Sequence, residues 1–257
     1  MKASDVKKPS WLPRWLRPVP RRLAEARAFT SDRFGEALDA ALGIAGWLHP
    51  DQAAMICHLA HLCPGGPIVE IGSFKGKSTV FLARARKTSN TLTAIDPHLL
   101  TYAGDDRDRD RSFRNEATSW DAFQETLRNW DLDSRIEILR EFSHEVVKRW
   151  SDPIAFLWID GDHREESVSR DIADWVDFVL PGGFVGFHDT HPHHAGHGGP
   201  RRALAAVGFL KDHGFDTWLE LRNAWFFRRR DSFSRGERDR TPSAESASPA
   251  DRTKIRD

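Results

Sequence analysis

Hydrophobic and polar positions follow two alternating periods between residues 67 and 213. Short apolar runs that end in polar residues predict buried strands, and the segments between them repeat apolar residues at helical spacing. Strands alternating with helices predict a mostly parallel sheet covered on both faces. The strands are expected at 67–71, 91–96, 135–139, 154–160 and 183–188, and the helices between and after them at 76–86, 120–130, 143–150, 165–178 and 200–213.

The segments on either side of this alternation complete the predicted architecture. Runs at 216–219 and 224–227 predict a terminal antiparallel pair, so we expect a Rossmann-like, doubly wound α/β fold with a seven-stranded sheet in three α/β/α layers. Helices are expected at 34–48 and 51–62. We divide the chain into a basic, Trp-rich N-terminal extension with a helix (1–49), one domain (50–230) and a polar tail (231–257), which we expect to be disordered.

Composition narrows the classes of protein. The 257 residues carry 38 Lys and Arg against 38 Asp and Glu, so overall charge provides no argument for nucleic acid. Cys57 and Cys63 lack the spacing of a redox or zinc pair, and no apolar run approaches the roughly 20 residues that span a bilayer. We expect a reduced, cytoplasmic protein. Trp11 and Trp15 lie among arginines and prolines, which indicates weak membrane-surface contact, a homodimer contact or packing on its own domain.

Residues 68–79, Ile-Val-Glu-Ile-Gly-Ser-Phe-Lys-Gly-Lys-Ser-Thr, carry the most informative pattern. A phosphate-binding P-loop needs one more residue between Gly72 and Gly76, and a dinucleotide fingerprint needs glycine where Phe74 stands. The remaining pattern, acid-x-Gly-x-x-x-Gly, resembles the first motif of class I S-adenosylmethionine-dependent methyltransferases. It predicts the first cofactor-binding residues, Glu70, Gly72, Ser73, Phe74, Gly76 and Ser78.

Polar residues at the ends of later strands predict the rest of the site, because ligands bind at the carboxyl ends of such strands. Asp96 follows Gly72 by 24 positions, where an acid can accept both ribose hydroxyls; the alternative is a turn aspartate before Pro97. Asp160 and Asp189, with His188, offer oxygen and imidazole ligands for a divalent cation. A histidine ligand favours a transition ion over Mg²⁺, and the metal stays open.

Four segments together resemble one subfamily of these methyltransferases, over about residues 50–228. The subfamily contains macrolide-sugar and aminocoumarin O-methyltransferases and cephalosporin-hydroxylase-like proteins. The segments are Val69-Glu70-Ile71-Gly72, Ala94-Ile95-Asp96, Trp158-Ile159-Asp160-Gly161-Asp162-His163 and Gly186-Phe187-His188-Asp189-Thr190.

The resemblance implies residue roles at these motifs. It places S-adenosylmethionine in the first half of the sheet and a divalent metal at Asp160, His188 and Asp189, although His188 stands where an acid is more usual. It also implies that His163 is a general base, the alternative being a solvent-facing histidine at a helix start. Asp160 therefore counts as both catalytic and cofactor-binding, and Phe142 and Ser143 are expected beside the adenine.

We therefore expect a metal-assisted O-methyltransferase acting on a hydroxyl of a sugar or small natural product. The alternatives are a hydroxylase-like or metal-independent relative and a non-catalytic binding module. Residues 98–118 are expected to form a lid over the site, in preference to a calcium-binding loop. Residues 191–197 are expected to form a mobile loop that contacts the substrate, in preference to a second metal site. Arg201 and Arg202 would hold an anionic substrate or face water.

Overall fold

The protein folds around a seven-stranded sheet that is parallel except at one edge. The computed structural model describes residues 20–99, 119–190 and 206–232, and its strand order is β3-β2-β1-β4-β5-β7-β6. Strands β5 with β7 and β6 with β7 pair antiparallel. The strands are β1 Ile68–Ile71, β2 Leu92–Ile95, β3 Glu137–Leu139, β4 Ile154–Ile159, β5 Val179–Phe187, β6 Phe215–Leu221 and β7 Ala224–Arg229.

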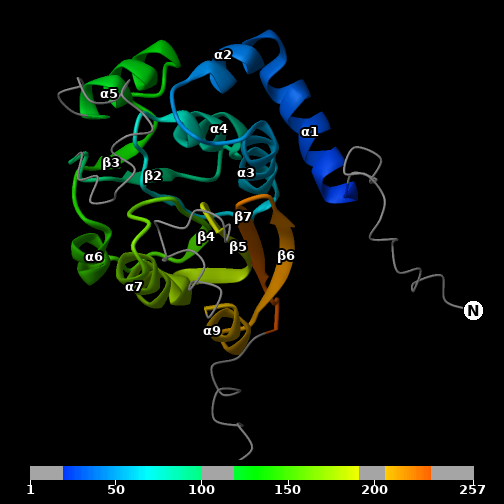
Figure 1. Ribbon diagram of the computed structural model, residues 1–257, viewed down its shortest axis with the longest axis vertical. Coiled ribbons are helices and arrows are strands. Elements are labelled where there is room, and N and C mark those ends of the chain that lie inside the picture. The colour runs from blue at the N-terminus through cyan, green and yellow to red at the C-terminus, as the bar shows by residue number, and fades with distance from the viewer. Residues whose placement is uncertain (1–19, 100–118, 191–205, 233–257) are drawn as a thin grey trace, which may run out of the picture.

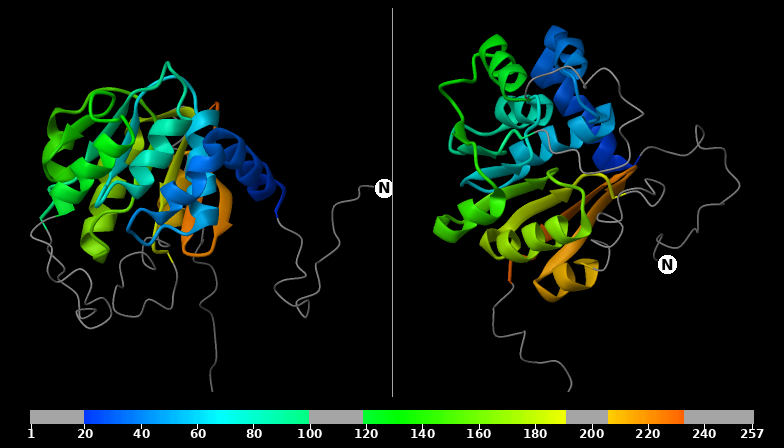
Figure 2. Two further views of the ribbon diagram at one scale, coloured as in Figure 1. Left: turned by 90° about the horizontal axis from the view of Figure 1, so that it is seen from above. Right: turned by 60° about the vertical axis from the view of Figure 1, so that its left-hand side comes forward.

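Helices cover both faces of the sheet and make three layers (Figures 1 and 2). Helices α1 to α5 lie on one face, and α6, α7 and α9 lie on the other. This arrangement confirms the predicted Rossmann-like fold. The helices are α1 Arg21–Phe34, α2 Leu38–Gly43, α3 Pro50–Leu62, α4 Lys77–Ala85, α5 Ser119–Asn129, α6 Ser143–Val146, α7 Glu165–Trp175 and α9 Ala206–Asp212, with 3-10 turns η2 Gly35–Ala37, η5 Val147–Arg149 and η6 Val176–Phe178.

Two apolar cores follow from the alternation of side chains along the strands. In β4, Phe156 and Trp158 pack toward α3 and α4, whereas Leu157 and Ile159 pack toward α6 and α7. Trp158 and Trp175 are completely buried, as their apolar surroundings in the sequence predict. Because β1 and β4 are buried on both faces, their polar groups can reach solvent only at the strand ends.

The helices before β1 differ from the prediction. The helix expected over 34–48 forms only in part, as the 3-10 turn η2 and the short α2, and the longer helix α1 over Arg21–Phe34 was not predicted. Gly35 ends α1 with a φ of +53°, a backbone conformation that favours glycine. Leu23 and Ala26 of α1 are buried against α3, so this part of the predicted extension belongs to the main core.

Several predictions fall on residues that the structure does not describe. These are the Trp-rich start at 1–19, most of the proposed lid at 100–118, the His-rich loop with Arg201 and Arg202, and the tail beyond 232. Within the described ranges, none of the helices combines the length and apolar content needed to cross a bilayer.

The strand ends come together where the strand order reverses, between β1 and β4. At the carboxyl ends of the strands, the backbone hydrogen bonds of the sheet continue for one more residue. The residue that directly follows each of four strands, β1, β2, β4 and β5, is therefore fixed beside its neighbour. The bonds are Gly72 N to Ile95 O at 2.9 Å, Asp96 N to Leu139 O at 3.1 Å, Asp160 N to Ile71 O at 2.8 Å and His188 N to Ile159 O at 3.1 Å.

Candidate active site

The glycine bend, residues 72–76, is held tightly against the end of β4. Gly72 has a φ of +87°, and a Cβ built there would lie 2.2 Å from the carbonyl oxygen of Asp160. The missing side chain therefore serves the close approach of two backbone segments, as well as any approach by a ligand. Phe74 follows in the left-handed region at φ +46°, and Gly76, also left-handed, is the N-cap residue directly before α4. Such conformations in ordinary residues are concentrated at functional sites.

Asp96 closes the bend from the neighbouring strand. Its Oδ2 accepts the backbone N–H groups of Ser73 at 2.9 Å and Phe74 at 2.8 Å. Its Oδ1 accepts the N–H of His98 at 2.7 Å, which is the turn geometry of the alternative interpretation. A carboxylate offers about four acceptor positions, so these three bonds leave room for a ribose hydroxyl. The ribose-binding role of Asp96 stays a prediction.

Glu70 lies beneath the bend and is completely buried. Its Oε2 accepts a hydrogen bond from Thr79 Oγ1 at 2.6 Å, whereas Oε1 has no hydrogen-bond partner among the described residues. Burial raises the pKa of Glu70 to about 7, although the hydroxyls of Ser78, Thr79 and Ser73 oppose this rise. In this arrangement Glu70 supports the bend from below, and the predicted direct contact of Glu70 with a cofactor stays a prediction.

The buried Glu70 predicts a pH dependence of stability. Because its pKa lies at about 7 in the folded state against 4.5 when exposed, the unfolded chain loses this proton first as the pH rises. Folding stability should therefore fall between about pH 4.5 and pH 7, by about 3 kcal/mol from this group. In Glu70→Gln, urea unfolding at pH 5 and pH 8 should show that this loss has disappeared. The control Glu166→Gln, at an exposed position of α7, should still lose stability between pH 5 and pH 8 as the wild type does. If Glu70→Gln lost as much stability as the wild type over this range, Glu70 would not be the group responsible.

Four titratable side chains meet at the ends of β4 and β5. Asp160 follows β4, His163 lies three residues later, and His188 and Asp189 follow β5. One ligand atom from each of the four lies within 4.8 Å of all the others. His188 Nδ1 is 3.1 Å from Asp160 Oδ1 and 3.3 Å from Asp189 Oδ1. The structure thus brings together the three predicted metal ligands and the predicted base.

His163 bridges the two acids. Its Nε2 lies 3.4 Å from Asp160 Oδ1, and its Nδ1 lies 3.3 Å from Asp189 Oδ2. The side chain is 31% exposed, so His163 faces the cluster and is still reachable from solvent. Both ring nitrogens of His163 therefore face carboxylates, which differs from the alternative interpretation of a histidine that faces only solvent.

Opposite charges inside the cluster set its pKa values. Burial would lower the pKa of His188, but Asp160 and Asp189 outweigh it and raise the pKa to about 10. The same two acids raise the pKa of His163 against the effect of burial. Burial would raise the pKa of both acids, but the facing imidazoles hold it below the ordinary aspartate value. The two carboxylates thus favour the charged form of each imidazole, and the imidazoles favour the charged form of each carboxylate.

The cluster also fits a divalent cation. His188 Nδ1 is buried and close to two carboxylate oxygens, yet it has no partner in hydrogen-bond geometry within the described part of the chain. Ligand atoms about 2.0–2.2 Å from a shared ion lie at most about 4.4 Å apart, close to the spacing found here. Two imidazoles and two carboxylates suit a transition ion better than Mg²⁺, which prefers oxygen ligands.

Phe142 and Ser143 follow β3, which lies on the side of β2 away from β1, and they form the start of α6. Phe142 is 46% exposed and lines a hollow of about 390 Å³ together with Pro97 and Leu99. The hydroxyl of Ser143 donates to Asp171, whose burial raises its pKa to about 6. The exposed apolar faces of Phe142 and Leu99 therefore suit a flat ring, whereas the Ser143 hydroxyl is already engaged by the protein.

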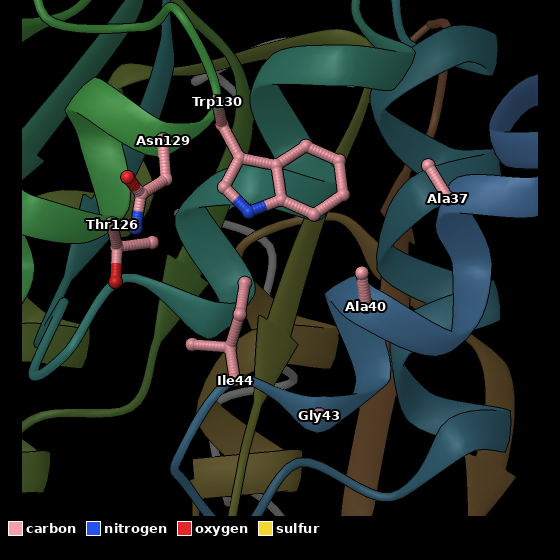
Figure 3. A pocket seen from close by; sticks show the side chains of 7 residues that line it. All are labelled: Ala37, Ala40, Gly43, Ile44, Thr126, Asn129 and Trp130. Carbon is pink, nitrogen blue, oxygen red and sulfur yellow. The ribbon is translucent and has the colours of Figure 1, made fainter.

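Another hollow, of about 540 Å³, lies between α2 and the end of α5 (Figure 3). Trp130 and Ile44 border it, and Ala37 and Ala40 of the α2 side face them. None of the predicted site residues lines this hollow. The predicted site residues therefore lie at the strand ends and not in this hollow.

The strand order and the glycine bend define the class I methyltransferase fold, and comparison with known proteins supports this assignment. Residues 69–190, a little under half of the chain, match a family described as "Methyltransferase domain". The match covers all four motif segments, from Val69 to Thr190. The match supports the expected class, a class I S-adenosylmethionine-dependent methyltransferase.

Solved structures share the fold at low sequence identity. Cofactor-bound Rv0187 from MTB has a TM-score of 0.55 at 17% identity, covering 84% of this chain and 93% of that one. The O-methyltransferase TomG from Streptomyces achromogenes, in complex with SAM, has a TM-score of 0.53 at 17% identity, covering 84% and 92%. The O-methyltransferase from Bacillus cereus, in complex with SAH, has a TM-score of 0.54 at 13% identity, covering 83% and 92%.

A curated relative matches a smaller part of the chain. The uncharacterized protein R132 of Acanthamoeba polyphaga mimivirus is 26% identical over 126 residues, which are 47% of this chain. This chain spans about half the length of that relative.

Two residues beside the cluster were missed in the sequence. Gln52 in α3 has a side chain that contacts His188, and Asn223, in the turn between β6 and β7, bonds Asp189. Gln52 lies three residues after His49, a spacing typical of a helix capping box, but this signal concerns only the helix start. Nothing in the sequence indicates that the two amides lie beside β5.

Proposed function

We propose that this chain is an S-adenosylmethionine-dependent O-methyltransferase that acts on a small-molecule hydroxyl with the help of a divalent cation. The observation that carries the proposal is the position of the Asp160, His163, His188 and Asp189 cluster. It lies beside the glycine bend at the point where strand order reverses, which is where ligands bind in such folds. Neighbours of this fold include O-methyltransferases solved with SAM or SAH.

Different residues at the strand ends would bind different parts of the methyl donor and the acceptor. The bend and Asp96 would hold the methionine and ribose parts of the methyl donor, and the hollow at Phe142 would take its adenine. Bound there, the donor supplies an electrophilic methyl group. The cluster lies at the end of β4, on the far side of β1 from Asp96, so donor and acceptor would meet over β1.

Proton transfer falls to His163. A divalent cation held by Asp160, His188 and Asp189 would supply the positive charge that makes an acceptor hydroxyl more acidic. His163 would then receive the hydroxyl proton as the oxygen bonds to the methyl carbon, while the bond from that carbon to the donor's sulfur breaks and S-adenosylhomocysteine leaves. Its partial exposure leaves a path for the proton to solvent, and its two carboxylate neighbours would stabilise the imidazolium that forms. The protein thereby contributes positioning and electrostatics.

Binding and chelation experiments test this proposal. We expect calorimetry to show S-adenosylmethionine binding, and a panel of sugars and phenols to reveal methyl transfer by mass spectrometry. Removal of metal with EDTA should lower the rate at least about tenfold, because the cation supplies several kcal/mol of stabilisation. Added Mn²⁺ should restore the rate. Activity that survives EDTA would indicate a metal-independent enzyme, and no cofactor binding at all would favour a non-catalytic module.

The ligand set also favours one second candidate. Two imidazoles with carboxylates occur in non-haem iron sites of oxygenases, so a hydroxylase-like activity is the alternative that the cluster itself supports. Metal analysis of the purified protein separates the two. Bound iron without any methyl transfer would favour the hydroxylase-like relative.

A further inference from the structure

A closed ring of hydrogen-bonding groups surrounds one side of the cluster. Gln52 Oε1 lies 3.3 Å from His188 Nε2, and Gln52 Nε2 donates to Asn223 Oδ1 at 2.5 Å. Asn223 Nδ2 donates to Asp189 Oδ1 at 2.7 Å, and that same oxygen lies 3.3 Å from His188 Nδ1. The ring thus joins the side chains of two cluster residues through two neutral amides.

The backbone fixes the direction of every bond in this ring. The N–H of His49 donates to Gln52 Oε1 at 2.8 Å, and a backbone N–H can only donate. Gln52 must therefore present its oxygen on this side and its NH₂ group to Asn223. The facing atom of Asn223 must then be its oxygen, which leaves its NH₂ group for the carboxylate of Asp189.

This direction determines how His188 is protonated. Gln52 Oε1 can only accept, so His188 Nε2 next to it carries a hydrogen. The other ring nitrogen, Nδ1, is then turned toward Asp160 Oδ1 and Asp189 Oδ1. In proteins, the hydrogen bond made by one imidazole nitrogen selects the nitrogen that is available to a metal.

The ring is built on rigid parts of the fold. Gln52 is completely buried in the first turn of α3, and the His49 side chain accepts the N–H of Asp51 there. Arg27 of α1 holds Asp51 with bonds of 2.8 and 2.6 Å. The backbone carbonyl of Asn223 accepts the N–H of Thr190 at 2.8 Å, so the β6–β7 turn is also tied to the end of β5.

We propose that Gln52 and Asn223 are positioning residues that set His188 as an Nδ1 ligand for a cation between Asp160 and Asp189. This inference rests on the metal part of the proposed function. The amides do not touch the cation; they fix the tautomer of His188 and the rotamer of Asp189. Partners of this kind typically change metal affinity by 10- to 100-fold when removed.

Metal binding to the full-length protein tests the proposal. We would titrate Mn²⁺ and follow the free ion by electron paramagnetic resonance in the wild type, Gln52→Met and Asn223→Ala. Met keeps the length of Gln52 but cannot accept from His188, so the dissociation constant for Mn²⁺ should rise about 10- to 100-fold. Asn223→Ala should also raise the dissociation constant for Mn²⁺. This variant breaks the ring at a turn, where a substitution disturbs folding less than one in the buried helix α3.

A control and a spectroscopic measurement separate positioning from simple loss of structure. Thr30→Val removes a buried hydroxyl that bonds Ala54 of α3 at 3.3 Å, outside the ring, and should leave Mn²⁺ affinity within about twofold. In the Zn²⁺-loaded wild type, imidazole ¹⁵N shifts of His188 should show a protonated Nε2 and a metal-bound Nδ1. In Gln52→Met this pattern should change to a mixture or to binding through Nε2.

Each failure has a distinct result. Wild-type Mn²⁺ affinity in both ring variants, or Zn²⁺ bound through Nε2 in the wild type, would overturn the positioning role while the metal site stands. A wild type that binds neither ion would overturn this inference together with the metal part of the proposed function. Calorimetry with S-adenosylmethionine on the same samples would then show whether the methyltransferase proposal survives alone.

Discussion

Replacing Asp160 with Asn should reduce methyl transfer by about 100- to 1,000-fold while S-adenosylmethionine affinity changes by less than about threefold. Asp160 lies within 3.4 Å of both cluster histidines, so its charge organises the cluster and would hold the cation. Losing that charge should remove several kcal/mol of transition-state stabilisation, at about 1.4 kcal/mol for each tenfold in rate. Most contacts to the methyl donor are expected from the glycine bend and Asp96, so the Asp160 carboxyl group should contribute less to donor binding than to turnover. Steady-state kinetics and calorimetry on the same protein would measure the two effects.

Asp162 provides the matched control for this substitution. It lies two residues later, and its carboxylate pairs with Arg164 and accepts from Ser167 at 2.8 Å, away from the cluster. Asp162→Asn should therefore leave the rate close to that of the wild type. If Asp160→Asn also transferred methyl groups at the wild-type rate, the metal-centred mechanism would be wrong.

Replacing Gly72 with Ala should destabilise the fold by about 2–5 kcal/mol. The new Cβ would lie 2.2 Å from the carbonyl oxygen of Asp160 and 2.6 Å from the Cα of Gly161, and both are backbone atoms that cannot turn aside. Overpacking of this kind costs about 1–3 kcal/mol, and a non-glycine residue at a φ of +87° adds about 1–2 kcal/mol. Urea denaturation would measure the change in the free energy of unfolding.

The same substitution at Gly43 should have no destabilising effect and serves as the control for Gly72→Ala. Gly43 ends α2, and a Cβ built there meets nothing within 4 Å. Gly43→Ala should be neutral or stabilising by up to about 1 kcal/mol, because alanine loses less chain entropy in a helix. Equal stability of the Gly72 and Gly43 variants would show that the bend can move away from β4.

The strands, and the positions of the polar residues at their ends, could be predicted from the sequence because each depends on local patterns. Apolar runs end at Glu70, Asp96, Asp160 and His188, and the fold rule for parallel sheets brings such ends together. The parallel pairing of β1 with β2 and β4 then places these residues as expected. Which methyl acceptor the site takes stays a prediction.

The amide ring could not be predicted because its members are far apart in the sequence. Gln52 and His188 are separated by 136 positions, and Gln52 and Asn223 by 171. Amides in a helix start and in a turn have ordinary local explanations, so neither stands out. The N-terminal helices were misplaced for a related reason: the burial of Leu23 and Ala26 depends on α3, which the local pattern around them does not reveal.

The ion pair between Arg27 and Asp51 links the segment before the sheet to the proposed metal site. It fastens α1 to the same turn of α3 that carries Gln52. A chain trimmed to start at residue 50 would expose the apolar surface of α3 and free the amide beside His188. Shortening this protein to residues 50–230 would therefore loosen the proposed ligands His188 and Asp189 through Gln52, without changing any residue of the cluster itself.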